Sequence, residues 1–285
     1  MNIAIDVNFT RVNAFEVADN VIKELHKLGA VVLLSSDIQG KYFYDNIIYD
    51  DFDNAVKTCD MLISIGGDGT FIHSSHLAAK YDKEILGVNA GNLGFLAGLE
   101  KQELHLLKNI ITGSYNIDKR MMLRCEHYED GKFVNKYHCL NDVVISRGTS
   151  FRMCDISVLC DGKKVNDYYG DGIIIATPTG STAYSLSSGG PVVEPTIESI
   201  ILTPVCTHSL FARSFIFKED SKLEIKVKNP QICLPLFSCD GEKAIEISES
   251  TKLIISRADR SCKIVRLKSD SFTDVLSKKL IERRV

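Results

Sequence analysis

The sequence lacks any apolar stretch near the roughly 18 residues that a membrane-spanning helix needs. It also lacks a basic segment followed by an apolar run at its start, the pattern of an export signal. Met1 leads directly into a predicted strand instead. We therefore expect a cytoplasmic protein with no membrane partner.

Positive charge is not in excess. Lys and Arg total 34 against 37 Asp and Glu, so the formal net charge is −3. General nucleic-acid binders are usually basic, and we therefore expect no nucleic-acid partner. A 45% share of hydrophobic residues over 285 positions can form the cores of one large or two ordinary domains.

Metal-binding patterns are missing as well. None of the nine cysteines forms a C-x-x-C pair, and the seven histidines contain no H-E-x-x-H pattern. Without an export signal, we expect the cysteines to be reduced and mostly buried. The sequence leaves any metal ligands unknown.

The first hundred residues alternate between strand-like and helix-like periodicity. This alternation predicts a parallel sheet with helical crossovers, whose ligands bind beyond the carboxyl ends of the strands. The expected strands are 2–7, 30–34, 61–65 and 85–88, and the expected helices are 14–28, 51–59 and 101–112.

The pattern after about residue 112 is different. Short strand-like runs alternate with turn signals, which predicts an all-β sandwich, and residues 271–284 return to helical spacing. We expect an α/β domain over 1–105 with 268–285, and a β-sandwich domain over 106–267. The expected strands of the second domain are 140–146, 155–160, 172–176, 223–227, 243–247, 252–256 and 263–265.

A glycine-rich run, Gly66-Gly67-Asp68-Gly69-Thr70, directly follows the expected strand 61–65. Glycines let the backbone approach a ligand closely, and a helix starting at about Thr70 would offer N–H groups to an anion. A nucleotide phosphate suits such a loop, but Asp68 would repel it. Asp68 therefore takes a proton, holds a metal ion or orients a hydroxyl, unless the run is an ordinary turn.

Two further segments suit a nucleotide. Residues 171–184 end in a turn of hydroxyl and small side chains that suits a ribose, and Tyr184 offers a face on which a base can stack. Asp142 follows Asn141, and its carboxylate can accept hydrogen bonds from both hydroxyls of a ribose diol. Taken alone, either segment is also compatible with a plain turn.

Together these motifs resemble the NAD kinase family. The resemblance rests on the glycine-rich run, the loop 87–96, the pair Asn141-Asp142, and the segment from Gly170 through Ser187, which follow one another in the family's order. It implies an α/β domain followed by a β-sandwich domain, with the active site between them and a C-terminal helix that packs back on the first domain.

The resemblance also implies an activity. Members transfer the γ-phosphate of ATP, or of polyphosphate in some cases, to the 2′-hydroxyl of the adenosine ribose of NAD. They need a divalent cation, usually Mg²⁺, and usually form homodimers or homotetramers.

Residue roles carry over by position. Asp68 is the expected proton acceptor, and Gly66, Gly67, Gly69 and Thr70 form the expected ATP phosphate loop. The expected NAD-binding residues are Asp68, Gly69, His73, Asn141, Asp142, Arg152, Tyr169, Asp171, Thr182, Ala183, Tyr184, Ser185, Leu186 and Ser187.

One departure concerns the ribose contact, because the family's common pair is Asn-Glu and this chain has the shorter Asp142.

Two other functions use similar features. A kinase acting on a lipid or a sugar phosphate shares the glycine–aspartate turn, and a non-catalytic sensor could bind NAD or NADP without turnover. The hydroxyl-rich segment argues against a lipid substrate, and Asp68 would be of no use to a sensor.

Overall fold

The structure is a computed structural model that describes the whole chain except residues 12, 92–93, 209–211, 270 and 283–285. The chain forms two compact units, Met1–Lys119 with Cys262–Val285, and Arg120–Ser261. The first unit thus extends further along the chain than the domain expected over 1–105. No helix in the described part of the chain is long and apolar enough to cross a membrane.

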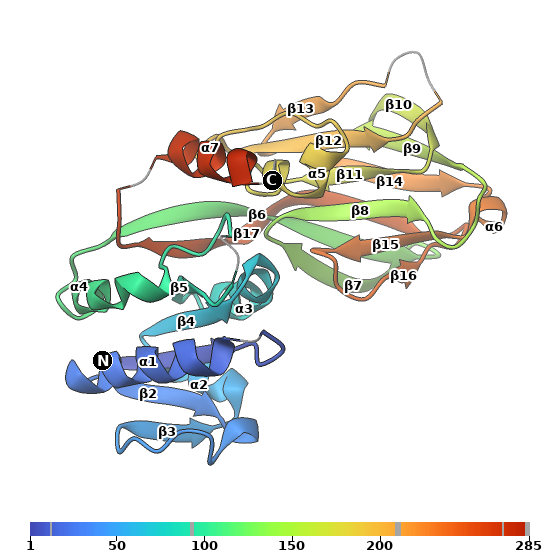
Figure 1. Cartoon of the computed structure of the whole chain (residues 1–285). Helices are drawn as coiled ribbons and strands as arrows, with labels where there is room; N and C mark the ends of the chain where they lie inside the picture. The colour runs from blue at the N-terminus through green and yellow to red at the C-terminus, as the bar shows by residue number, and fades with distance from the viewer. Residues whose placement is uncertain (12, 92–93, 209–211, 270, 283–285) are drawn as a thin grey trace. The chain divides into compact units, whose positions relative to one another are not determined.

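The first unit contains a parallel sheet in the strand order β5-β4-β1-β2-β3, with the end of β17 alongside β5 (Figure 1). Four of its strands fall where the sequence periodicity predicts them, and β3 was not expected. The elements of this unit are β1 (Asn2–Val7), α1 (Ala14–Lys27), β2 (Val31–Ser35), η1 (Ser36–Ile38), β3 (Ile47–Asp50), α2 (Phe52–Thr58), β4 (Met61–Gly66), α3 (Asp68–Lys80), β5 (Glu84–Asn89), η2 (Lys101–Leu107), α4 (Lys108–Ile111) and α7 (Phe272–Glu282).

Both faces of this sheet are buried. One set of alternating strand residues, including Ile3, Ile63 and Leu86, packs in one core with α1 and the η2–α4 segment. The opposite set, including Ala4 and Leu62, is also fully buried. Burial on both faces explains why these strands have nearly continuous apolar sequences.

The second unit is an antiparallel β structure with two groups of strands. One sheet has the order β13-β12-β11-β8-β15-β16, and the other group contains β10-β9-β14-β17 and the β6–β7 hairpin. The elements are β6 (Asn116–Glu129), β7 (Lys132–Cys139), β8 (Asp142–Arg147), β9 (Cys154–Cys160), β10 (Lys163–Gly170), β11 (Gly172–Ala176), η3 (Gly180–Thr182), α5 (Tyr184–Ser187), β12 (Ser199–Val205), β13 (Phe215–Lys218), β14 (Leu223–Lys228), α6 (Pro230–Cys233), β15 (Pro235–Cys239), β16 (Ile245–Glu246) and β17 (Lys252–Arg266).

Side chains from both groups of strands form one core. Val143 and Ile145 from one sheet share it with Ile156 and Val158 from the other group, and all four are fully buried. Strands such as β9 and β14 bury every second residue in this core, whereas β11 and β12 are buried on both faces. This result confirms the predicted α/β and β-sandwich fold classes.

Asp-Gly pairs make three tight turns in this unit. Asp130-Gly131, Asp161-Gly162 and Asp240-Gly241 all have positive φ at both residues, between 49° and 78°. Two consecutive residues with positive φ define the type I′ turn, which matches the twist of a β-hairpin. The third pair lies beside the candidate site.

Two predictions of secondary structure were wrong. The segments expected as separate strands, 252–256 and 263–265, belong to the single strand β17. The helix expected over 101–112 is a 3₁₀ helix followed by a short α-helix, with a capping box between Glu100 and Glu103 at its start. Helical spacing alone does not separate these two helix types.

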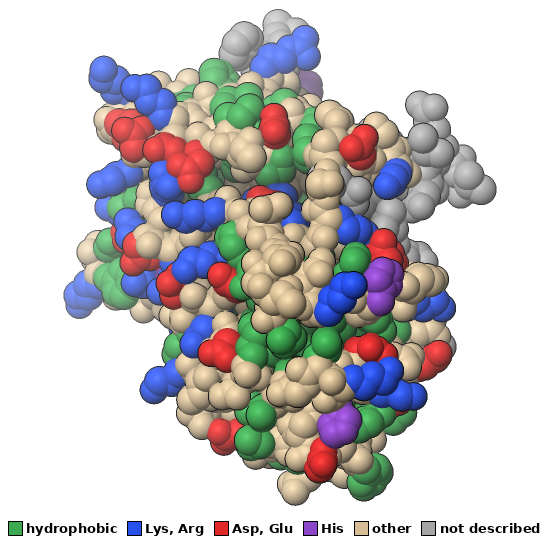
Figure 2. Space-filling view, turned by 90° about the vertical axis from the view of Figure 1, so that its left-hand side faces the viewer, with side chains coloured by type: hydrophobic (Ala, Val, Ile, Leu, Met, Phe, Trp, Pro, Cys, Tyr) green, Lys and Arg blue, Asp and Glu red, His purple; other side chains and the backbone are tan. Residues whose placement is uncertain are grey.

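The described surface carries mixed charge. Figure 2 shows acidic and basic side chains interspersed on the face that it presents. This distribution agrees with the small net charge of −3.

Candidate functional site

In the first unit, the glycine-rich run connects β4 to α3, as the sequence predicts. The helix, however, begins at Asp68 and not at Thr70, with Gly67 as its N-cap in an extended conformation. Asp68 and Gly69 therefore lie in the first helical turn. A carboxylate is favoured there by the positive end of the helix dipole, which gives Asp68 a structural reason that the sequence analysis did not consider.

The Asp68 carboxylate is held by the loop that follows β5. Its Oδ2 accepts a hydrogen bond from the Phe95 backbone N–H at 2.7 Å, and its Oδ1 accepts one from Leu96 at 3.0 Å. The loop approaches so closely that a Cβ on Gly94 would lie 2.2 Å from Asp68 Oδ1. Residues 92–93, part of the motif quoted above, lie outside the described residues.

Thr70, in the first turn of α3, contacts the segment that follows β1. Its Oγ1 accepts a hydrogen bond from the Asn8 side chain at 2.9 Å, and a Cβ on Gly66 would lie 2.4 Å from the same oxygen. His73 is exposed on α3. The loop between β4 and α3 is therefore fixed from two sides, by the segment after β1 and by the loop after β5.

In the second unit, Asn141 and Asp142 occupy the turn that leads into β8. Three consecutive backbone N–H groups of this turn donate to the carboxylate of Asp240, which follows β15. The distances are 2.6 Å from Leu140, 2.8 Å from Asn141 and 2.9 Å from Asp142. In return, the Asp240 N–H donates to the Asp142 carbonyl at 2.9 Å.

The turn after β11 packs directly on this pair. Thr177 donates from its N–H to the Asn141 carbonyl at 2.8 Å and from its hydroxyl to the Leu140 carbonyl at 2.6 Å. A Cβ on Gly180 would lie 2.2 Å from the Asn141 carbonyl oxygen. The structure thus brings together two of the sequence motifs, Asn141-Asp142 and the hydroxyl-rich turn.

Asp142 is buried and has an altered acidity. Only 5% of the residue is exposed. Burial is the main cause that raises the pKa of Asp142 from 3.8 to about 7, and the neighbouring Asp240 and Cys239 add to the shift. A carboxyl group with a pKa near neutrality in a site is a candidate functional group.

The residues after the turn differ in exposure. Tyr184 is 47% exposed, and Ser187 is exposed too. Ser185, in contrast, is fully buried, and its hydroxyl shares a hydrogen bond of 2.9 Å with that of Thr203. Ser185 therefore contributes to packing, and the exposed side chains on α5 are free to meet a ligand.

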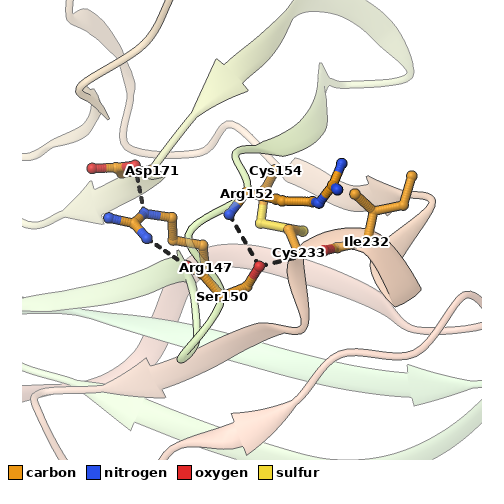
Figure 3. The surroundings of a disulfide bond; sticks show 7 residues. All are labelled: Arg147, Ser150, Arg152, Cys154, Asp171, Ile232 and Cys233. Carbon is orange, nitrogen blue, oxygen red and sulfur yellow. Dashed lines mark hydrogen bonds and ion pairs between the residues drawn. A yellow bond between two sulfur atoms is a disulfide. The ribbon is translucent and has the colours of Figure 1, made fainter.

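Asp171 forms a second polar group with Arg147 (Figure 3). The Arg147 Nε donates to Asp171 Oδ1 at 2.6 Å, and a second guanidinium nitrogen donates to the Ser150 carbonyl. The Ser150 hydroxyl in turn accepts a hydrogen bond from the Arg152 N–H at 3.0 Å. Tyr169 is 52% exposed.

The two polar groups of the second unit lie at opposite ends of one strand pair. Asp142 is paired with Ala176 at one end of β11, whereas Asp171 directly precedes Gly172 at the other end. Five strand residues span roughly 17 Å. A ligand that contacts both aspartates would therefore have to be extended along β11.

The expectation that all cysteines are reduced was wrong. Cys154, at the start of β9, and Cys233, at the end of α6, form a disulfide beside the Ser150–Arg152 turn (Figure 3). They are 79 residues apart in the sequence, so no local pattern could reveal the pairing. The other seven cysteines are not disulfide-bonded.

Sequence reasoning also missed two residues of the site. Asp240 and Arg147 each act on another residue and carry no motif of their own. Asp240 stands before Gly241, and an Asp-Gly pair indicates a turn without indicating a role in a site. Among the described residues, no group of three or more His, Cys, Asp or Glu side chains could hold a metal ion.

Two family models match the chain. One is described as the ATP-NAD kinase N-terminal domain and covers residues 3–115, and the other as the ATP-NAD kinase C-terminal domain, over residues 140–267. The NAD kinase of Ruminiclostridium cellulolyticum is 37% identical over 99% of this chain and 98% of its own length. That of Thermoanaerobacter sp. is 36% identical over 97% of each chain.

Solved structures with a similar fold are consistent with these matches. A yeast NADH kinase in complex with NADH aligns with a TM-score of 0.86 and 24% identity, over 97% of this chain and 85% of its own. An NAD kinase from Archaeoglobus fulgidus in complex with ATP aligns with a TM-score of 0.73 and 23% identity, over 97% and 99%. At these identities the likeness establishes the fold, and it confirms the predicted two-part architecture.

Proposed function

This chain belongs to the NAD kinase family, and we propose that it transfers the γ-phosphate of ATP to the 2′-hydroxyl of the adenosine ribose of NAD, which yields NADP. Relatives named NAD kinase align with this chain over nearly their whole length. The observation that supports the reaction most directly is the Asp68 carboxylate, held by two backbone N–H groups at the start of α3.

Asp68 is the proposed catalytic residue. An ionised carboxylate has about four lone-pair sites, so the hydrogen bonds from Phe95 and Leu96 leave room for a ribose hydroxyl. The carboxylate would orient that hydroxyl and accept its proton as the bond to phosphorus forms. General base catalysis of this kind typically contributes ~10²–10⁴-fold.

The ATP phosphates are assigned to the residues around Asp68. Gly66, Gly67, Gly69 and Thr70 surround the first turn of α3, where backbone N–H groups have no partner within the helix. We expect positioning and charge stabilisation there to supply most of the remaining rate enhancement.

A divalent cation, expected to be Mg²⁺, fits this arrangement only together with the substrate. The described residues offer no protein cage for a metal, and Mg²⁺ is commonly held by one or two carboxylates plus substrate phosphates. Asp68 is the carboxylate placed to contribute. Bound there, the cation would neutralise charge on the phosphates.

We assign NAD mainly to the Asn141-Asp142 pair and to the segment from Gly170 through Ser187. Asn141 and Asp142 would hold the ribose and amide of the dinucleotide, and Asp171 would contact the nicotinamide amide. We retain Gly69, His73, Arg152, Tyr169, Thr182, Ala183, Tyr184, Leu186 and Ser187 as proposed contacts, and give Ser185 a supporting role because it is fully buried.

We also propose that the protein works in the cytoplasm as a homodimer or homotetramer, as the family resemblance implies. Its partners would then be small-molecule nucleotides and copies of itself. Gel filtration with light scattering would measure the oligomeric state.

A coupled assay tests the proposed reaction. Purified protein is incubated with ATP, Mg²⁺ and NAD, and NADP is detected with an NADP-specific dehydrogenase. Parallel reactions replace NAD with diacylglycerol or fructose phosphate, and ATP with polyphosphate. NADP formation from ATP and NAD is the expected result. Tight NADP binding without any turnover would instead favour a sensor.

A further inference from the structure

Asp240 interacts with the Asn141-Asp142 turn but was assigned no role above. It receives three consecutive backbone N–H groups from residues 140–142, all at 2.9 Å or less. Hydrogen bonds to an ionised acceptor are about twice as strong as neutral ones. One carboxylate therefore sets the backbone of the whole turn, including the residue at which β8 begins.

The connection is reciprocal and spans much of the sequence. The Asp240 N–H donates to the Asp142 carbonyl, and Asp240 lies in a type I′ turn with Gly241 that directs it toward residues 140–142. The two segments are about a hundred residues apart in the chain, with separations between 98 and 100. Neither segment can fix this geometry alone.

Asp240 also acts on Asp142 through its charge. The titratable groups that influence Asp142 are Asp240 and Cys239, both at the end of β15, and both oppose its ionisation. On the other flank, its β11 partner is Ala176, followed by Thr177, and neither titrates in this range. Removing the Asp240 charge would therefore lower the pKa of Asp142.

We propose that Asp240 is a positioning residue for the dinucleotide, whose carboxylate holds the Asn141-Asp142 turn in the conformation that binds the ribose. Asp240 acts through the turn and does not touch the substrate. This inference rests on the proposed function, because it takes Asn141 and Asp142 as NAD-binding residues.

The test compares Asp240→Asn and Asp240→Glu with the unaltered protein. For each, KM and kcat for NAD are measured at pH values on both sides of about 7, the pKa of Asp142. Calorimetry gives the Kd for NAD over the same pH values. Thermal unfolding shows whether each variant is folded.

For Asp240→Asn we expect KM and Kd for NAD to rise about tenfold, which corresponds to 1.4 kcal/mol, with a much smaller change in kcat. The pH midpoint of NAD binding should move to lower pH, because a like charge beside Asp142 is gone. Asp240→Glu keeps the charge but displaces the carboxylate, so binding should weaken while the midpoint stays. If only the Glu variant folds, its Kd for NAD decides the matter: weaker binding supports the inference, and normal binding overturns it.

The inference is overturned if Asp240→Asn binds NAD normally, or if binding weakens without movement of the pH midpoint. The second result would mean that Asp240 only stabilises the fold. Because the Kd needs no turnover, a protein that binds NAD but forms no NADP would overturn the proposed reaction and leave the Asp240 result standing.

Discussion

The Asp68 carboxylate occupies space that only glycine can leave open at position 94. A Cβ there would approach Asp68 Oδ1 to 2.2 Å, well inside any real contact. The loop after β5 and the start of α3 are therefore fitted to each other around one carboxylate, which both Phe95 and Leu96 bind.

Gly94→Ala tests this fit. The added methyl group should displace either the loop or the Asp68 side chain, and we expect kcat to fall by about 10–100-fold, the scale of a misplaced catalytic group. Gly91→Ala is the matched control in the same loop, because nothing lies within 4 Å of a Cβ there. Steady-state kinetics of both variants measure the effect, and equal activities would show that the contact has no catalytic role.

Asp142→Asn should stabilise the protein at high pH while it weakens NAD binding. The folded-state pKa of about 7 lies above the ordinary 3.8, so the folded chain binds more protons between these values and the free energy of unfolding decreases as pH rises. Removing the charge should raise that free energy on the order of 4 kcal/mol at pH 8, and little near pH 4. Denaturant unfolding at the two pH values, with an NAD titration at pH 8, checks both effects.

Substitutions of Ser185 and Ser187 should distinguish a residue that packs in the core from one that binds NAD. Ser185→Ala leaves the buried Thr203 hydroxyl with one partner fewer, which we expect to reduce the free energy of unfolding by about 1 kcal/mol with the KM for NAD nearly unchanged. Ser187→Ala, at an exposed position, should raise that KM without loss of stability. Thermal unfolding and kinetics of the pair test the assignment, and the reverse pattern would contradict it.

Counting the thiols tests the Cys154–Cys233 disulfide directly. Of nine cysteines, two are paired, so titration of thiols in denaturant should find seven before reduction and nine after it. Cys233→Ser should lower the free energy of unfolding by about 2–4 kcal/mol without reductant, whereas Cys206→Ser, at an exposed free thiol, should change it little. Nine thiols before reduction would contradict the pairing.

Much of the first unit could be predicted because its determinants are local. Its central strands are buried on both faces and have continuous apolar sequences, and α1 shows a clear apolar stripe ended by Gly29 with a φ of +73°. β6 and β7 were not predicted. Much of β6 is buried while most of β7 is exposed, so neither shows the simple alternation that identifies a strand.

The candidate site was only partly predictable for a related reason. Asp68 and Asn141-Asp142 lie in recognisable local patterns, so the sequence could propose them. Asp240 reaches its partners across about a hundred residues, and the Cys154–Cys233 pair across 79. Such relationships depend on which strands the fold places together, and no window of sequence contains that information.

The central claim is that the Asp68 carboxylate activates the ribose hydroxyl of NAD, and the Asp68→Asn variant tests it most directly. Its Kd for NAD and its rate of NADP formation in a single turnover should be measured side by side with the unaltered protein. The account predicts a Kd within about threefold and a rate lower by at least ~10²-fold. A variant that binds NAD and forms NADP at nearly the normal rate would contradict it.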